Sequence, residues 1–182
     1  QNEAMNSWAS KYKVYSINTS EEIELIKDKY PYITFIENES IYISGRKKLT
    51  RLSGILQVAK KINCDTVAIV NSDIILSNKV RNLLDNKYIK KGLTIATRWE
   101  IDGDKPYYPF VDGYDLFIFN KKYIDLYDND SYVIGMPWWD YWIPLISISA
   151  NIPVYHIKNK VIFHRTHQTN YDHDDWIKFG EY

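Results

Sequence analysis

A short polar triplet follows the most continuous apolar run of the sequence. The run Thr66–Val70 is rich in β-branched residues, a pattern that predicts a strand covered on both faces in a parallel sheet. Asn71, Ser72 and Asp73 follow it directly. Ligands of open α/β sheets bind outside the carboxyl ends of the strands, so the triplet is expected to face a binding crevice. Oxygen ligands suit Mg²⁺ or Mn²⁺, and Asp73 is therefore predicted to hold a metal, with Asn71 or Ser72 assisting. The alternative is a polar turn that closes the strand by local hydrogen bonds.

A second candidate is a carboxylate surrounded by tryptophans. Asp140 lies next to Trp139 and close to Trp138 and Trp142. Indole faces stack on sugar rings, and an apolar wall raises the pKa of a carboxyl group toward that of a general base. Asp140 is therefore predicted to be catalytic and the three tryptophans to bind substrate. The alternative makes Asp140 the N-cap of the following helix and the tryptophans part of the core.

Histidines gather near the end of the chain. Three of the four, His164, His167 and His173, fall here, and His164 directly follows the strand-like run Val161–Phe163. Imidazole is a good ligand for Mn²⁺ or Zn²⁺. His164 and His167 are therefore predicted metal ligands, and a solvated turn is the alternative.

Three further charged residues lie at expected strand ends. Arg98 follows the run Leu93–Thr97 and is a candidate for binding phosphate. Asp112 and Asp115 flank the entrance to another strand, where a carboxylate can accept hydrogen bonds from the hydroxyls of a substrate. An ordinary turn around Gly113 is the alternative for these two.

The apolar pattern predicts the elements that must position these residues. Helices are expected near 4–12, 20–29, 52–63, after Ser77, and over 121–127 and 141–150; strands are expected near 14–17, 33–36, 66–70, 93–97, 114–119, 154–156 and 161–163. Their alternation predicts an α/β fold, with a mostly parallel open sheet and helices on both faces. With 182 residues, the chain is expected to form a single domain over 1–182.

Composition excludes several classes of protein. Lys plus Arg and Asp plus Glu both number 23, which argues against nucleic acid or an anionic membrane surface as a partner. No apolar run is long enough for a membrane span. A single cysteine, Cys64, excludes an internal disulfide. The segment is expected to be soluble, with the cytoplasm as the preferred but undecided compartment. Walker, GxGxxG and GxSxG motifs are all absent.

Taken together, these residues resemble the GT-A class of nucleotide-sugar glycosyltransferases. Asn71-Ser72-Asp73 is similar to the DxD-type metal motif of that class, and Trp138-Trp139-Asp140-Tyr141-Trp142 to its acceptor-side acidic motif. Val161-Ile162-Phe163-His164 is similar to its late metal-binding histidine. The opening residues resemble the first helix of the class, so the first strand is expected to be missing and the segment to belong to a longer protein.

The resemblance implies transfer of a sugar from a nucleotide-diphosphate sugar donor to a hydroxyl of a carbohydrate, protein or small-molecule acceptor. Mn²⁺ or Mg²⁺ would bridge the diphosphate to Asp73 and His164, and Asp140 would act as base in an inverting reaction. Asn71 departs from the usual DxD and leaves one charge fewer for the metal. A non-catalytic carbohydrate-binding or scaffold domain and a metal-dependent hydrolase are the alternatives.

Overall fold

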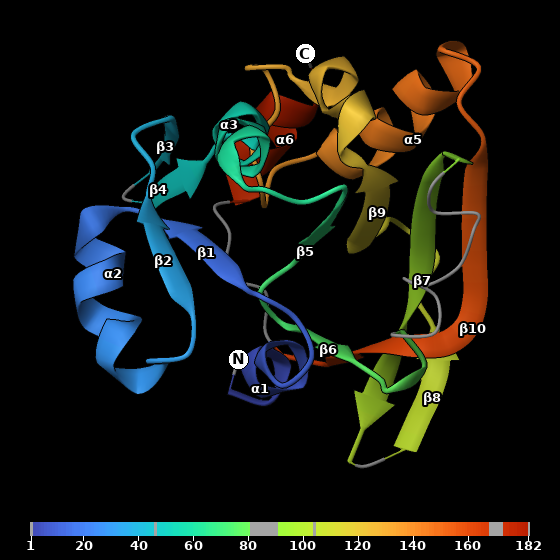
Figure 1. Cartoon of the computed structure of the whole chain (residues 1–182), viewed down its shortest axis with the longest axis horizontal. Coiled ribbons are helices and arrows are strands. Elements are labelled where there is room, and N and C mark those ends of the chain that lie inside the picture. The colour runs from blue at the N-terminus through green and yellow to red at the C-terminus, as the bar shows by residue number, and fades with distance from the viewer. Residues whose placement is uncertain (1, 46, 81–90, 104, 168–172, 182) are drawn as a thin grey trace.

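The fold was analysed in a computed structural model that describes residues 2–45, 47–80, 91–103, 105–167 and 173–181. It is a mixed α/β structure, in which a six-stranded sheet carries helices on both faces (Figure 1). The expected α/β class is thereby confirmed. Among the described residues, no helix is both long enough and apolar enough to cross a membrane.

The first part of the chain forms a small parallel pair of strands. Helix α1 (Asn2–Ala9) leads to β1 (Tyr15–Asn18), α2 (Ser20–Ile26), the 3-10 turn η1 (Lys27–Lys29) and β2 (Thr34–Glu37). The side chain of Thr19 accepts a hydrogen bond from the backbone of Glu22, and the Glu22 carboxylate accepts one from the backbone of Thr19. This capping box confirms the predicted start of α2.

A hairpin that the sequence patterns did not reveal follows. Strands β3 (Ile41–Ser44) and β4 (Lys47–Thr50) pair antiparallel before α3 (Leu52–Lys61) and β5 (Thr66–Val70). Gly45 has a φ of 58° at the hairpin's turn, a left-handed conformation that glycine adopts at little cost.

The central sheet has the order β5-β9-β7-β10-β6, and β8 pairs with β7. Its further strands are β6 (Ile74–Leu76), β7 (Leu93–Asp102), β8 (Lys105–Pro109), β9 (Leu116–Asn120) and β10 (Val154–Arg165). Among the described strands of this central sheet, only β7 and β10 pair in parallel. The expectation of a mostly parallel sheet is therefore wrong for the neighbouring pairs, because β9 returns between β5 and β7 and reverses both pairings.

Strand β5 lies at one end of this sheet and not between parallel neighbours. In the described part of the chain it pairs only with β9, and Ile69 is buried whereas Ala68 is exposed. The expectation that Thr66–Val70 is covered on both faces is therefore wrong. The outer edges of β5 and β1 each have no strand partner among the residues that the structure describes.

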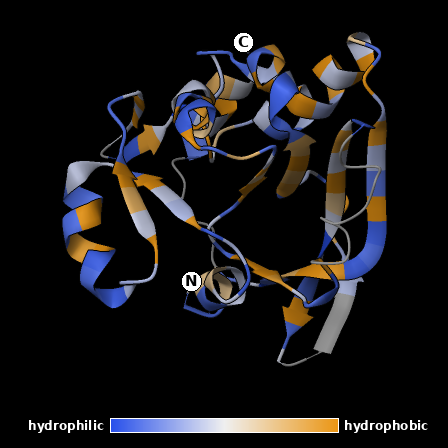
Figure 2. Cartoon of the chain, viewed as in Figure 1, coloured by the Kyte–Doolittle hydropathy of each residue, from blue (hydrophilic) through white to orange (hydrophobic). Residues whose placement is uncertain are grey.

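Two apolar clusters lie on the two faces of the sheet. In β9, Leu116 and Ile118 join one cluster whereas Phe117 and Phe119 join the other, as expected for side chains that alternate along a strand. Helix α1 covers the first cluster, and α3, the 3-10 helix η3 (Lys121–Tyr127) and α5 (Trp139–Ser149) cover the second. The hydrophobic colour of β9 in Figure 2 reflects this burial on both sides.

The last strand is longer than expected. The two predicted strands at 154–156 and 161–163 are one strand, β10, whose pairing with β7 shifts register between Ile157 and Ile162. The bend of β10 is visible in Figure 1. Helix α6 (His173–Gly180) closes the described chain. Of the helix predicted after Ser77, residues 81–90 lie outside the described residues, and the Ser77 hydroxyl accepts a hydrogen bond from the backbone of Lys79.

Side chains of α1 cover the outer edge of β6. The Trp8 indole donates a hydrogen bond of 2.7 Å to the carbonyl of Ile74, and the Ser7 hydroxyl accepts one of 2.9 Å from the amide of Leu76. Trp8 is buried. Backbone groups at a sheet edge need such partners when water is excluded. Helix α1 therefore fixes β6, and with it the turn that holds Asp73.

We expect Trp8→Phe to lower the free energy of unfolding by about 1–3 kcal/mol, because it leaves a buried carbonyl without its donor. Urea unfolding followed by circular dichroism measures this loss. Ser10→Ala, just beyond the same helix, is the matched control and should change stability by less than about 0.5 kcal/mol. Equal stability of Trp8→Phe and the wild type would contradict the role given to α1.

Candidate active site

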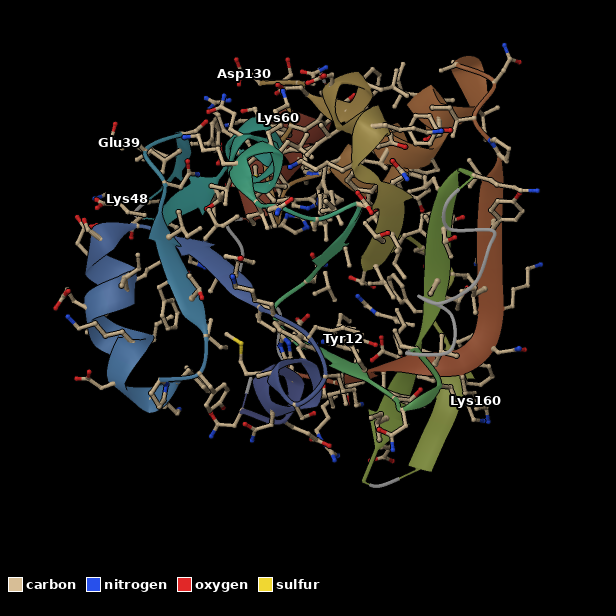
Figure 3. The ribbon with its side chains drawn as sticks, viewed as in Figure 1. Tyr12, Glu39, Lys48, Lys60, Asp130 and Lys160 are labelled. Atoms are coloured by element: carbon tan, nitrogen blue, oxygen red, sulfur yellow. The ribbon has the colours of Figure 1, made fainter. Side chains whose placement is uncertain are left out.

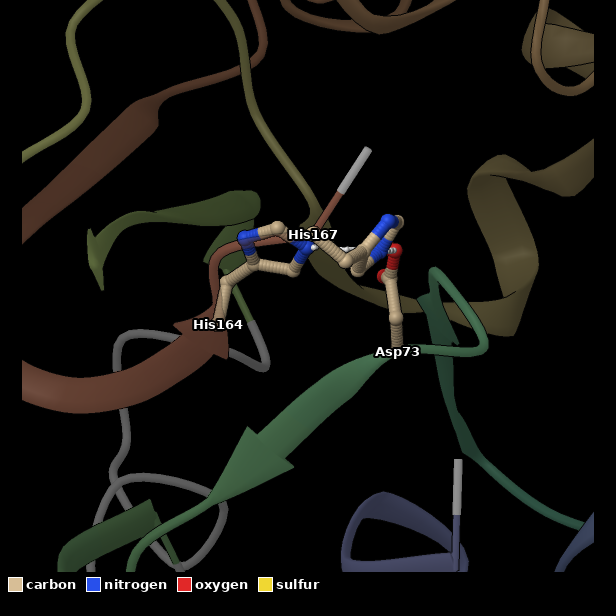
Figure 4. Close-up of side chains that lie close together, drawn as sticks. All are labelled: Asp73, His164 and His167. Carbon is tan, nitrogen blue, oxygen red and sulfur yellow. Dashed lines mark hydrogen bonds and ion pairs between the residues drawn. The ribbon is translucent and has the colours of Figure 1, made fainter. Parts of the chain in front are cut away.

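One carboxylate and two imidazoles meet at the end of β10. Asp73 ends the turn between β5 and β6, and the pairing of Ile74 with His164 brings this turn beside β10. The Asp73 Oδ2 atom lies 3.4 Å from His164 Nε2 and 3.3 Å from His167 Nε2. Figure 4 shows the three side chains converging, and one ligand atom from each lies within 4.8 Å of the others. The structure thus brings together the three residues predicted as metal ligands.

The chemistry of these donors fits a divalent cation. Imidazole nitrogen and carboxylate oxygen together suit Mn²⁺ and Zn²⁺. Around them, the Arg98 guanidinium pairs with the carboxylates of Glu100 and Asp115, and the carboxylate of Asp73 contacts both histidines. With neutral histidines this leaves an excess of negative charge, which a bound cation would offset. Three protein ligands also leave coordination positions for the oxygens of a substrate.

A buried glutamate orients His164. Glu100 is 3% exposed, and its Oε2 atom lies 2.8 Å from His164 Nδ1. An imidazole that donates from one nitrogen to a carboxylate presents the lone pair of the other nitrogen to a metal. The sequence analysis missed Glu100. The available signal was the alternation of Arg98 and Glu100 on either side of Trp99, which places both charged side chains on one face of β7.

Arg98 connects Glu100 to Asp115. Its Nε donates a hydrogen bond of 2.9 Å to Glu100, and its Nη1 lies 3.1 Å from both carboxylate oxygens of Asp115. The guanidinium also stacks on the ring of Phe110, 3.7 Å from its centroid. The structure therefore places Arg98 in a largely buried ion network, unlike the peripheral charged residues labelled in Figure 3, such as Lys48 and Lys160.

Asn71 and Asp115 bind each other. The Asn71 amide donates a hydrogen bond of 2.6 Å to the Asp115 carboxylate, and the Asn71 backbone amide donates one to the carbonyl of Asp115. Asp115 is 4% exposed, whereas Ser72 is exposed at the turn. This double link fixes the end of β5 to the start of β9, beside Asp73.

The ionisable groups of the network perturb one another. Burial alone would raise the pKa of Asp73, but hydrogen bonds and charge from His164 and His167 lower it to about 2. The hydrogen bond with Asp73 raises the pKa of His164. Burial raises the pKa of Asp115 and outweighs the attraction of Arg98. Without a metal, Asp73 and His164 therefore each favour the charged form of the other.

Asp140 lies in the first turn of α5, but it is not the N-cap. The N-cap is Trp138, whose φ of 75° is left-handed, so the alternative that made Asp140 the cap is wrong. The Asp140 Oδ2 atom accepts a hydrogen bond of 3.2 Å from the amide of Tyr114. A Cβ at Gly113 would lie 2.5 Å from this oxygen, so a side chain there would displace the carboxylate. Burial raises the pKa of Asp140, although the Tyr114 amide opposes the shift.

The three tryptophans beside Asp140 separate into different environments. Trp139 is buried against Phe117, and Trp142 stacks on Tyr132 with ring centroids 5.2 Å apart. Trp138 is 49% exposed, and its indole donates to the carbonyl of Gly180. Of the predicted substrate-binding indoles, only Trp138 presents much of its surface to solvent.

Two tyrosines that the sequence patterns did not predict as site residues lie near Asp140. Tyr141 is 40% exposed and lies edge-on to Tyr114, with ring centroids 6.1 Å apart. Tyr114 also packs edge-on against His156. Asp112 is exposed nearby, and its charge contributes to a raised pKa of Tyr141, after the larger effect of burial. Aromatic rings and two carboxylates therefore share this surface.

No protein-family model matches the sequence, and a search of curated proteins found no match. Solved structures do match. A candidate nucleotide-diphospho-sugar transferase from Desulfovibrio desulfuricans G20 superposes with a TM-score of 0.56 at 15% identity, over 91% of this chain and 66% of that one.

The fold of this chain is similar to that of this transferase. At this identity the likeness concerns the fold alone. Two weaker matches, each at 8% identity, are a candidate glucose-1-phosphate thymidylyltransferase from Bacillus anthracis, with a TM-score of 0.45, and the inositol-1-phosphate CTP transferase from T. maritima, with 0.47. They cover 81% and 92% of this chain, and 68% and 74% of their own.

The role of Glu100 can be tested by metal titration. We expect Glu100→Gln to weaken Mn²⁺ binding by about 10–100-fold, because the loss of a carboxylate behind a ligating histidine has that effect elsewhere. Isothermal titration calorimetry measures the affinity, and the exposed Glu39→Gln is the matched control. Unchanged affinity in a folded Glu100→Gln protein would refute the assignment.

The raised pKa of Asp140 has a consequence for stability. A carboxyl group whose pKa is higher in the folded state destabilises the fold once the pH exceeds its unfolded value of 3.8. Asp140→Asn should therefore raise the free energy of unfolding at pH 7, and this gain should vanish as the pH falls toward 3.8. Urea unfolding at both pH values measures it, with the exposed Asp65→Asn as control. A gain that persists at the acidic pH would point to altered packing instead.

Proposed function

We propose that this protein is a metal-dependent glycosyltransferase, which moves a sugar from a nucleotide-diphosphate donor to a hydroxyl of an acceptor. The observation that carries the proposal is the convergence of Asp73, His164 and His167 at 3.2–3.4 Å from one another, with Asp140 on a neighbouring element. The fold shared with a nucleotide-diphospho-sugar transferase supports it. The chain covers 66% of that protein, so the activity named for that protein is only a proposal for this chain.

The donor side is assigned to the metal cluster. Asp73, His164 and His167 would hold Mn²⁺ or Mg²⁺, and the bound cation would neutralise the diphosphate as it leaves. Asn71 stands in place of the first carboxylate of a DxD motif, and its side-chain amide donates a hydrogen bond to Asp115. His167 supplies the third ligand in this proposal. Glu100 orients His164, and Arg98 holds Glu100 and Asp115 in place.

The acceptor side is assigned to Asp140. In an inverting transfer, its carboxylate takes the proton of the acceptor hydroxyl as that oxygen attacks the anomeric carbon. The bond from this carbon to the diphosphate oxygen breaks, and the electron pair leaves with the nucleoside diphosphate. A base raised in pKa toward neutrality removes this proton more effectively than an ordinary aspartate. In a retaining transfer, Asp140 would position the acceptor.

The test is a calorimetric titration of UDP, GDP, CDP and dTDP into the protein, with Mn²⁺ and then with excess EDTA. We expect one nucleotide to bind only with Mn²⁺, and Asp73→Asn to weaken that binding by at least about tenfold, since even outer-shell changes have this effect. Asp125→Asn is the matched control, because the side chain of Asp125 is 83% exposed.

A third variant separates binding from chemistry. Asp140→Asn should bind the nucleotide as the wild type does but transfer sugar about 10²–10⁴-fold more slowly, the usual contribution of a general base. Binding that survives EDTA would instead favour a carbohydrate-binding or scaffold role. Release of free sugar without any acceptor would favour a hydrolase.

A further inference from the structure

The outward face of α5 is apolar. Tyr141, Leu145 and Ile148 are 40%, 59% and 61% exposed. Their spacing of four and then three residues places them on one side of the helix. The rise of 1.5 Å per residue makes this stripe about 10 Å long. Trp138, 49% exposed, extends it by one turn toward the start of the helix.

This face lacks the charges that solvent-facing helices normally carry. Asp140 is the only charged residue in α5, whose sequence is WDYWIPLISIS. The opposite side of the helix packs into the core through Trp139, Ile143 and Pro144. A helix that is apolar on all sides is usually covered on all sides. The exposed stripe therefore has the character of a surface that binds an apolar ligand.

The stripe is continuous with the proposed acceptor site. Tyr141 follows Asp140 in the sequence, and its ring lies against Tyr114, whose amide donates to the Asp140 carboxylate. The ring of Trp138 lies 6.0 Å from that of Tyr141 on the other side. A ligand with a hydroxyl at Asp140 thus meets aromatic rings first and aliphatic side chains beyond them.

We propose that the acceptor is an amphiphile, in which the hydroxylated head is bound at Asp140 and an alkyl portion lies along Tyr141, Leu145 and Ile148. This inference rests on the proposed function and specifies its acceptor class. Asp112 and Asp140 provide acceptors for the hydroxyls of the head. The stripe offers no polar group beyond the Tyr141 hydroxyl to a longer polar chain, so a protein or polysaccharide acceptor fits it less well.

The test uses methyl, hexyl and octyl β-D-glucoside, each below its critical micelle concentration, and protein with labelled Leu and Ile methyl groups. Nuclear magnetic resonance should show the signals of Leu145 and Ile148 shifting with octyl but not with methyl glucoside. Because each buried methylene contributes about 0.8 kcal/mol, octyl glucoside should bind at least about tenfold more tightly than methyl glucoside.

Two double variants complete the design. Leu145→Ser/Ile148→Ser should abolish the dependence on chain length, whereas Leu25→Ser/Ile43→Ser should retain it. Leu25 and Ile43 are 83% and 66% exposed on α2 and β3, and they are matched controls for residue type. The chemical shift changes at Leu145 and Ile148 in the wild-type protein show whether the alkyl chain binds there, even if one double variant fails to fold.

Each other outcome overturns the inference. Equal shifts at Leu25 and Ile43 would mean general adsorption of detergent. Self-association that Leu145→Ser/Ile148→Ser removes would mean that a second copy of this chain covers the stripe. No dependence on chain length, in protein that binds a nucleotide with Mn²⁺, refutes the amphiphilic acceptor alone. Loss of that nucleotide binding in the separate titration refutes the proposed function, and the acceptor assignment with it.

Discussion

The antiparallel pairing of β6 with β10 is the constraint on which the candidate site depends. It sets Ile74 opposite His164, so the turn that ends at Asp73 meets the end of β10. Strand β6 is short and lies at the end of the sheet, where pairing is weakest. Trp8 and Ser7 of α1 therefore matter, because they bond to the backbone of β6 on its other side. The geometry of three side chains from distant parts of the sequence follows from this one register.

Behind the candidate ligands lies a network of buried charged residues. Arg98 joins Glu100 and Asp115, Glu100 orients His164, and Asp115 holds Asn71 at the end of β5. Burying ionised groups costs solvation free energy, and removing one partner leaves another charge uncompensated. Such a network adds little to the stability of the fold, but it fixes the orientation of the side chains that belong to it. It also links the metal cluster to Asp115, whose charge contributes to the raised pKa of Asp140.

The sequence predicted the elements better than their pairing. Apolar periodicity located α3, β5 and α5, and the helix expected near 20–29 begins at the capping box of Thr19, because these elements depend on local pattern and local hydrogen bonds. Pairing depends on contacts between distant residues, so the return of β9 between β5 and β7 left no local signal. The hairpin of β3 and β4 was missed because β4, with the sequence KKLT, has one apolar residue and so lacks the apolar run expected of a strand.

At the site, residue type predicted the candidate metal ligands but not the residues that support them. A carboxylate after a strand and clustered histidines were visible, and the structure brings Asp73, His164 and His167 together. Glu100 was missed because its role comes from burial beside His164, a contact that the alternation of Arg98 and Glu100 along β7 does not reveal. Trp139 and Trp142 were predicted to bind substrate. In the structure, Trp139 is buried, Trp142 is partly buried, and Tyr141 and Tyr114 lie beside Asp140. Side-chain direction at a helix start depends on the φ of Trp138, which sequence patterns do not encode.

Pulsed electron paramagnetic resonance of bound Mn²⁺ tests the central claim most directly, because it identifies the nuclei next to the ion. The account predicts coupling to two imidazole nitrogens, which His164→Ala and His167→Ala each reduce to one, and coupling to phosphorus when the nucleoside diphosphate that binds is added. Nitrogen coupling without phosphorus coupling would make the cluster a metal site that does not bind the donor. Absence of nitrogen coupling would contradict the site itself.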